Sequence, residues 1–128
     1  MHSGGPEMTK ILIVDDSSFA RNRLKVIFER AGHEVVGGAK NGEQALSMFK
    51  QMQPDVVTLD YLMAGKNGAE VLEDIMQLDP KARVIMVSGS ADHALENKLL
   101  SAGAKLFVEK FKNQKHFLEA VEQVMNSC

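Results

Sequence analysis

The chain has 128 residues, a size typical of one domain, and its 45% apolar and 25% charged residues indicate a globular protein rather than a disordered one. The formal net charge of −2 offers no general attraction for nucleic acid, and apolar runs of at most four residues exclude a membrane-spanning helix or a signal-peptide core. The single cysteine, Cys128, excludes an internal disulfide and a cysteine-based zinc site, so a reducing, cytoplasmic location is expected.

Residues 1–8 show no hydrophobic periodicity and include Gly4, Gly5 and Pro6. We predict a flexible N-terminal lead there, and a natural tail and a remnant of a cloning tag fit it equally well. The folded domain is expected to span residues 9–128.

Two kinds of segment alternate from residue 9 onward. Short apolar runs rich in β-branched residues indicate strands buried on both faces, at residues 11–14, 35–36, 56–59, 84–87 and 106–108. Between and after them, apolar residues at helical spacing predict one helix each: Ala20, Leu24, Ile27 and Ala31; Ala45, Met48 or Phe49, and Met52; Leu72, Ile75 and Leu78; Leu95, Leu99 and Ala102; Phe117, Val121 and Val124.

Punctuating residues agree with these boundaries. Asn41 and Asn67 are suited to N-caps, and Gly32 and Gly103 stand where the first and fourth helices should end. The pattern predicts an α/β fold of five βα units, (βα)₅. Its doubly wound, parallel, five-stranded sheet has the order 2-1-3-4-5 within three α/β/α layers, as in flavodoxin-like folds.

Polar residues follow four of the five predicted strands. The first strand is followed by Asp15 and Asp16, the third by Asp60, the fourth by Ser88, and the fifth by Glu109 and Lys110. The second strand runs into two glycines and offers no ionisable group. Because ligands of open α/β sheets bind at the carboxyl ends of the strands, we expect the three aspartates to converge there.

This set of residue types suits phosphoryl transfer. Neighbouring carboxylates repel one another, and Mg²⁺, a hard cation that prefers oxygen ligands, relieves that repulsion. An aspartate is also a nucleophile toward phosphorus, while an ammonium group and a hydroxyl stabilise the charge of the transferred group. Asp15, Asp16, Asp60, Ser88 and Lys110 supply each of these parts.

The same residues carry a resemblance to a known family. The segments 11–17 (ILIVDDS) and 55–60 (DVVTLD) with Met63 and Gly68, together with Val87-Ser88, residues 102–104 (AGA) and 108–110 (VEK), are similar to the CheY-like receiver domains of bacterial response regulators. The resemblance covers residues 9–125. It implies a phosphorylation-dependent signalling switch of two-component systems that is not itself an enzyme, apart from catalysing its own phosphorylation and dephosphorylation.

The resemblance also implies roles for individual residues. Asp60 is the expected phosphoacceptor, and Lys110 and Ser88 are expected to contact the phosphoryl group. Asp16, Asp60 and the Leu62 carbonyl are expected to bind Mg²⁺ directly, and Asp15 through water. Ser88 and Phe107 match the switch residues, and the helix 4, strand 5 and helix 5 face would change. A sensor histidine kinase or phosphotransfer protein is the implied donor, and the downstream target is a protein that the sequence does not identify.

Some positions depart from the family pattern. Ala64 and Phe111 stand where the family usually has prolines, and Gly89 precedes Ser90 in the loop after the fourth strand. Three other readings stay open: a receiver-like binding module that is not phosphorylated, an aspartyl-phosphate phosphatase and a flavin carrier. The phosphatase lacks its second aspartate because Leu62 stands there, and the flavin carrier lacks a phosphate-binding loop after the first strand. His33, His93 and His116 are expected to be solvated.

Overall fold

The structure, a computed structural model, describes residues 9–63, 65–89, 92–110 and 113–126. Five strands and five helices alternate along this part of the chain. Their bounds are β1 (Lys10–Val14), α1 (Ser18–Arg30), β2 (Glu34–Ala39), α2 (Gly42–Met52), β3 (Val56–Asp60), α3 (Gly68–Leu78), β4 (Val84–Ser88), α4 (His93–Ser101), β5 (Leu106–Glu109) and α5 (Gln114–Asn126).

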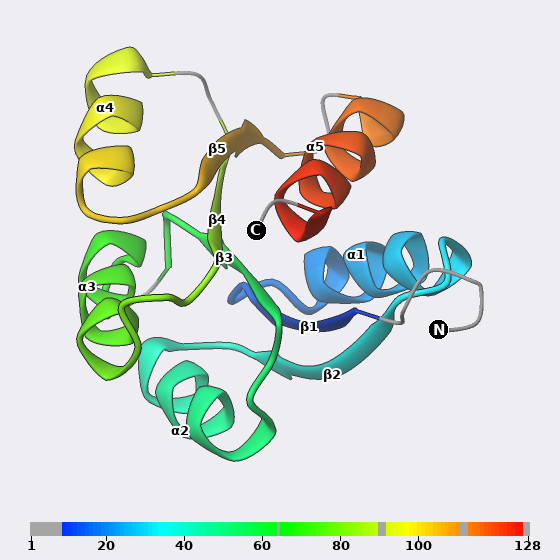
Figure 1. The fold of residues 1–128 in the computed structure, drawn as a ribbon, viewed down its shortest axis with the longest axis horizontal. Coiled ribbons are helices and arrows are strands. Elements are labelled where there is room, and N and C mark those ends of the chain that lie inside the picture. The colour runs from blue at the N-terminus through cyan, green and yellow to red at the C-terminus, as the bar shows by residue number, and fades with distance from the viewer. Residues whose placement is uncertain (1–8, 64, 90–91, 111–112, 127–128) are drawn as a thin grey trace.

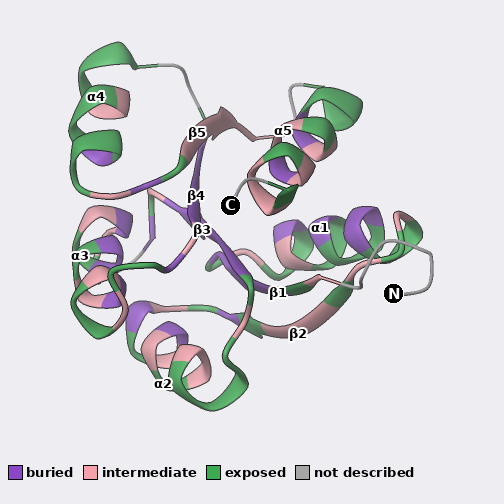
Figure 2. Ribbon diagram, in the orientation of Figure 1, coloured by how far each residue is buried: buried purple, intermediate pink, exposed green. Residues whose placement is uncertain are grey.

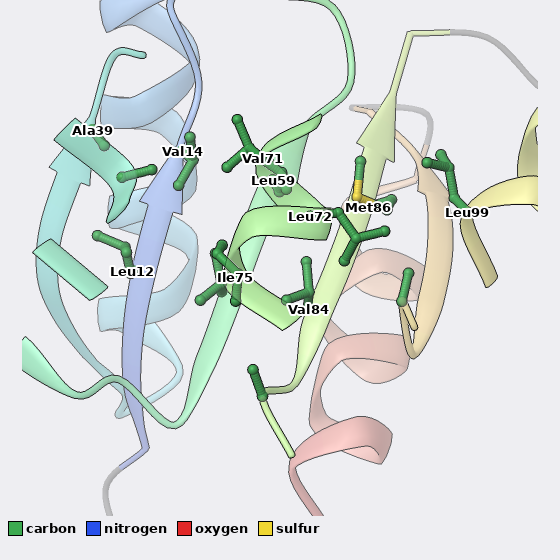
Figure 3. Packing of buried hydrophobic residues seen from close by; sticks show 14 of the residues in the cluster. Leu12, Val14, Ala39, Leu59, Val71, Leu72, Ile75, Val84, Met86 and Leu99 are labelled. Carbon is green, nitrogen blue, oxygen red and sulfur yellow. The ribbon is translucent and has the colours of Figure 1, made fainter. Parts of the chain in front are cut away.

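The five strands form one parallel sheet in the order β2-β1-β3-β4-β5, which confirms the predicted fold class. Helices α1 and α5 cover one face, and α2, α3 and α4 cover the other (Figure 1). Each face has its own apolar core, and the buried residues line the sheet and the inner sides of the helices (Figure 2). Figure 3 shows the larger core, in which Leu72 and Ile75 of α3 pack over Leu59, Val84 and Met86.

Helix boundaries follow the expected local chemistry. The side chains of Asn41 and Asn67 accept hydrogen bonds from the backbone N–H groups of Gln44 and Glu70, so both are N-caps as predicted. Gly32 and Gly103 follow α1 and α4 with φ angles of 91° and 117°, a conformation that glycine adopts without strain.

The edge strands differ from the prediction. β2 extends through Gly37, Gly38 and Ala39, because a strand needs only backbone pairing and glycines can supply it. The residues of β5 and most of those of β2 are at most partly buried, since an edge strand has a neighbour on one side only. The central strands β1, β3 and β4 are buried along almost their whole length, as predicted.

Several side chains lie elsewhere than the helical spacing predicts. Met52 and Leu78 occupy the last turns of their helices and are exposed. Phe28, which the predicted stripe of α1 omits, is fully buried and packs against Phe117 of α5 with ring centroids 5.8 Å apart.

One histidine assignment is wrong. The side chain of His33 is only 12% exposed, and its Nε2 lies 2.9 Å from the Glu122 carboxylate on α5. The contact links the turn after α1 to a helix that is remote in the sequence, so local pattern could not reveal it. His93 and His116 are exposed, as expected. None of the helices described is long and apolar enough to cross a membrane.

Candidate functional site

The strand register brings the predicted site residues to one edge of the sheet. Val14 pairs with Leu59, Asp60 with Val87, and Ser88 with Glu109, so the carboxyl ends of β1, β3, β4 and β5 finish side by side. Asp60 and Ser88 are the last residues of β3 and β4, so each strand extends one residue beyond its predicted apolar run. Asp15, Asp60 and Ser88 are buried, whereas Asp16 is exposed.

The three aspartates form a compact acidic cluster. Asp15, Asp16 and Asp60 each offer a carboxylate oxygen, and these oxygens lie within 4.8 Å of one another. Such a donor set, with one exposed carboxylate and two buried ones, fits a small divalent cation such as Mg²⁺, which binds through one or two carboxylates and keeps several waters. The structure therefore brings the predicted carboxylate ligands together.

Asp15 is anchored through its backbone and both side-chain oxygens. Its N–H donates to the Ala39 carbonyl of β2 at 2.9 Å, and its Oδ1 accepts from the Ser17 N–H at 2.9 Å. Its Oδ2 lies 2.5 Å from the Lys110 ammonium. Both oxygens of Asp15 therefore have protein partners, and the expectation that Asp16 and Asp60 bind Mg²⁺ directly and Asp15 through water stays a prediction.

Lys110 crosses the site from the end of β5. Its side chain is only 17% exposed, and its Nζ lies 2.5 Å from Asp15 Oδ2 and 3.5 Å from Asp60 Oδ2. Burial by itself lowers the pKa of Lys110, but the hydrogen bond with Asp15 and the charge of Asp60 outweigh it, so the pKa is raised. Lys110 is therefore a permanent cation beside the predicted phosphoacceptor.

The pKa of Asp60 is raised, whereas a salt bridge usually lowers the pKa of a carboxylate. Burial, followed by the negative charge of Asp15, raises the pKa of Asp60 from 3.8 to about 6, although Lys110 opposes both effects. An ionised Asp60 is therefore costly to the fold without a further cation. A divalent metal at this cluster would remove much of that cost.

The loop after Asp60 is fixed by a glycine. Gly68 donates its N–H to the Tyr61 carbonyl at 2.8 Å, and a Cβ on Gly68 would stand 2.7 Å from the Asp60 carbonyl oxygen. No other residue fits this approach between backbones, which explains the glycine in the motif. Leu62 lies in this loop with its side chain 69% exposed, and the role of its carbonyl as a ligand stays a prediction.

The two switch candidates occupy neighbouring strands. Ser88 accepts the Lys110 N–H through its backbone carbonyl at 2.7 Å, which ties the ends of β4 and β5 together. Phe107 is partly buried on β5, where it pairs with Met86 and packs against the larger core. It also borders a surface cavity of about 430 Å³ next to α5. The described residues do not include Ala64 and Phe111, which depart from the family pattern, or Ser90, which follows Gly89.

Comparison with known proteins decides the family. The sequence model of the response regulator receiver domain matches residues 11–122. The chain belongs to the response regulator receiver domain family. This receiver domain is 41% identical to the protein CcdB of Bacillus subtilis over 92% of this chain and 98% of that protein. It is 39% identical to the chemotaxis protein CheY of Thermotoga maritima, over 90% and 96% of the two chains.

A solved structure agrees with this receiver domain in fold. The complex of CheX and CheY with BeF₃ and Mg²⁺ from Borrelia burgdorferi contains a chain that superposes with a TM-score of 0.89 at 36% identity. The match covers 93% of this chain and 90% of that one. The predicted family and fold are thus confirmed, and the chain is a receiver domain of CheY type.

Sequence reasoning missed two residues of the receiver site. Arg21 of α1 donates from Nη1 to the Asp15 carbonyl at 2.7 Å, and Gly38 of β2 lies directly beneath its side chain. The prediction that the second strand contributes nothing ionisable is correct as far as it goes. The strand contributes through Gly38, whose missing side chain leaves room for Arg21. A search for charged residues does not detect such a contribution.

Proposed function

We propose that this receiver domain is a phosphorylation-dependent signalling switch in which Asp60 accepts a phosphoryl group. The observation that carries the proposal is the contact set around Asp60, in which Lys110 lies 3.5 Å away within a cluster of three aspartates. Without a ligand to bind, a cluster of like charges would only destabilise the folded state. The proposed domain spans residues 9–128.

The transfer uses this chain's residues in distinct roles. An Asp60 carboxylate oxygen attacks phosphorus, the new O–P bond forms, and the bond from phosphorus to the donor's imidazole nitrogen breaks. Lys110 and the Ser88 hydroxyl stabilise the negative charge on the phosphoryl oxygens. Asp16 and Asp60, with the Leu62 carbonyl, would hold Mg²⁺, which neutralises charge on the transferring group.

The response is proposed to pass through Ser88 and Phe107 to the face formed by α4, β5 and α5. Asp60 phosphorylation adds negative charge beside Lys110, whose backbone is tied to Ser88 at the ends of the neighbouring strands. Phe107 lies on β5 two residues before its carboxyl end and packs against the core that includes Leu99 of α4. The proposed partners are a histidine kinase or phosphotransfer protein and a protein target in the cytoplasm, and the chain acts on no other substrate.

Direct phosphorylation tests the proposal. Incubation with acetyl phosphate and Mg²⁺ should add one phosphoryl group, detected by intact-protein mass spectrometry and located on Asp60 by peptide mapping. Asp60→Asn should lose the adduct, whereas Glu73→Gln, which removes an exposed carboxylate on α3, should retain it. An equal adduct in Asp60→Asn would refute the assignment, and no adduct in the wild type would favour a binding module that is not phosphorylated.

Mg²⁺ should stabilise the protein through the acidic cluster. At a concentration about tenfold above its dissociation constant, the ion adds about 1.4 kcal/mol to the free energy of unfolding, equivalent to roughly 5 °C in melting temperature. Asp16→Ala should raise the melting temperature in EDTA, because repulsion falls, yet abolish the shift that Mg²⁺ causes. The measurement is a pair of thermal melts for each protein, and an equal Mg²⁺ shift in both would place the ion elsewhere.

A further inference from the structure

Arg21 makes a contact that the phosphoryl chemistry described above does not use. It lies in the first turns of α1, six residues after Asp15, and its Nη1 donates to the Asp15 backbone carbonyl at 2.7 Å. The side chain is partly buried rather than extended into solvent. A charged donor makes this a stronger hydrogen bond than one between neutral groups.

The path of the Arg21 side chain depends on Gly38. A Cβ on Gly38 would lie 3.3 Å from Arg21 Cδ, closer than most Cβ contacts, and 3.7 Å from its Nε, an ordinary contact distance. The neighbouring Gly37 faces the opposite side of the sheet, where a Cβ would meet Met48. The two glycines near the end of β2 therefore serve different faces, and Gly38 leaves room for the side chain whose guanidinium reaches the Asp15 carbonyl after β1.

The bonded carbonyl belongs to the peptide plane that leads into Asp16. Because the peptide unit is planar, a hydrogen bond to the Asp15 carbonyl also orients the Asp16 N–H and restricts the direction in which the Asp16 side chain leaves the backbone. The remaining contacts of Asp15, to Ala39, Ser17 and Lys110, hold the other side of this residue. Among the hydrogen bonds described for this segment, the bond from Arg21 restrains the peptide plane between Asp15 and Asp16.

The position of Arg21 has a cost that its contact must offset. A cation in the first turns of a helix is disfavoured by the positive end of the helix dipole, and this helix carries no acidic residue in its first turn. Ser17 already caps α1 by accepting from the Ala20 N–H, so Arg21 is not needed for that purpose.

We propose that Arg21 is a positioning residue that acts through the Asp15–Asp16 peptide to hold the Asp16 carboxylate in the geometry that binds Mg²⁺, and that Gly38 leaves the room that its side chain occupies there. The inference rests on the proposed function, because it assigns a residue that positions a ligand of the same metal site. Arg21 itself contacts neither metal nor phosphoryl group. Groups that orient metal ligands alter metal affinity by about 10- to 100-fold, and one acting through a backbone carbonyl should have a smaller effect.

Isothermal titration of Mg²⁺ into the unphosphorylated protein tests the role of Arg21. We expect Arg21→Ala to bind Mg²⁺ about fivefold more weakly than the wild type, below that range. The matched control is Lys25→Ala, which removes one positive charge from an exposed position on the same helix. Loss of a nearby cation alone would strengthen the binding of Mg²⁺, so weaker binding in Arg21→Ala indicates lost geometry rather than altered charge.

A double-mutant cycle with Gly38→Ala tests the path of the side chain. Gly38 has no positive φ, so alanine is compatible with its backbone, and the added methyl would push the Arg21 side chain by a few tenths of an ångström. We expect Gly38→Ala to weaken Mg²⁺ binding about two- to threefold on its own and to have no further effect in an Arg21→Ala background, where no Cδ remains to be displaced.

The outcomes separate the inference from the proposed function. A wild type that fails to bind Mg²⁺ would overturn both. A wild type that binds Mg²⁺ and an Arg21→Ala variant of equal affinity would overturn the inference alone, as would equal weakening in Lys25→Ala or additive losses in the double variant. Melts in EDTA check folding, and an unfolded Arg21→Ala variant leaves Gly38→Ala to decide: an unchanged affinity there also overturns the inference.

Discussion

Asp60→Asn should be more stable than the wild type at about pH 8 in the absence of divalent metal, by about 2–3 kcal/mol. Folding raises the pKa of Asp60 from 3.8 to about 6, so the folded state binds this proton more tightly than the unfolded chain does. Each unit of difference in pKa is worth about 1.4 kcal/mol in stability. Asparagine keeps the shape of the carboxyl group and cannot ionise, so it avoids this cost.

The sign of the effect defines a pH window. Stability attributable to Asp60 is fully present below pH 3.8, where the carboxyl is protonated in both states, and is lost as the pH rises through about 6. The advantage of Asp60→Asn over the wild type should therefore be near zero at about pH 3 and approach its full value above about pH 7. Urea denaturation of both proteins across this range measures it.

Glu73→Gln is the matched control, because Glu73 is an exposed carboxylate on α3 outside the cluster. Its stability should follow that of the wild type at every pH. Millimolar Mg²⁺ should shrink the advantage of Asp60→Asn, since the ion stabilises the ionised cluster of the wild type. A variant that is equally stable at pH 8, or less stable, would show that Lys110 fully compensates the burial of Asp60.

The central part of the fold was predictable because sequence pattern and topology agree there. Strands buried on both faces produce continuous apolar runs, and in a parallel sheet their carboxyl ends share one edge. The sequence pattern alone therefore predicts that Asp15, Asp60 and Ser88 lie together. The order of the strands follows from short, right-handed connections. Family resemblance then supplied roles that strand ends alone do not give.

The contacts that escaped prediction have a different physical origin. The Arg21 bond to Asp15 uses a backbone acceptor, which is the same for every residue type, and the space over Gly38 is an absence of atoms. The His33–Glu122 contact joins residues 89 positions apart. Each depends on how helices sit on the sheet, so no local periodicity encodes it. Met52 and Leu78 are likewise exposed, because helical spacing alone does not show which turns of a helix have packing partners.

Leu62→Asn should shorten the lifetime of the phosphorylated protein several-fold. Hydrolysis of an aspartyl phosphate needs a water in line with the O–P bond. The resemblance to receiver domains implies that the side chain two residues after Asp60 borders that approach, and we expect this of Leu62. Leucine cannot hydrogen-bond a water, so positioning of the attacking molecule from this residue is absent in the wild type. We therefore expect spontaneous dephosphorylation to be slow, which would suit responses that last longer than fast chemotactic ones. Ser90, the other residue expected to border this approach, lies outside the described residues.

Because Leu62 is exposed, its substitution should have little effect on the stability of the fold. Its side chain is 69% exposed, so asparagine should leave the free energy of unfolding within about 0.5 kcal/mol of the wild type. Leu62→Ala is the matched control, because it removes the bulk of leucine without adding a polar group. After phosphorylation and removal of the donor, decay is followed in Mg²⁺ by mass spectrometry. Faster decay in Leu62→Asn alone supports water positioning, equal acceleration in both variants shows that leucine acts by shielding the phosphorus, and unchanged decay in both means that Leu62 does not limit hydrolysis.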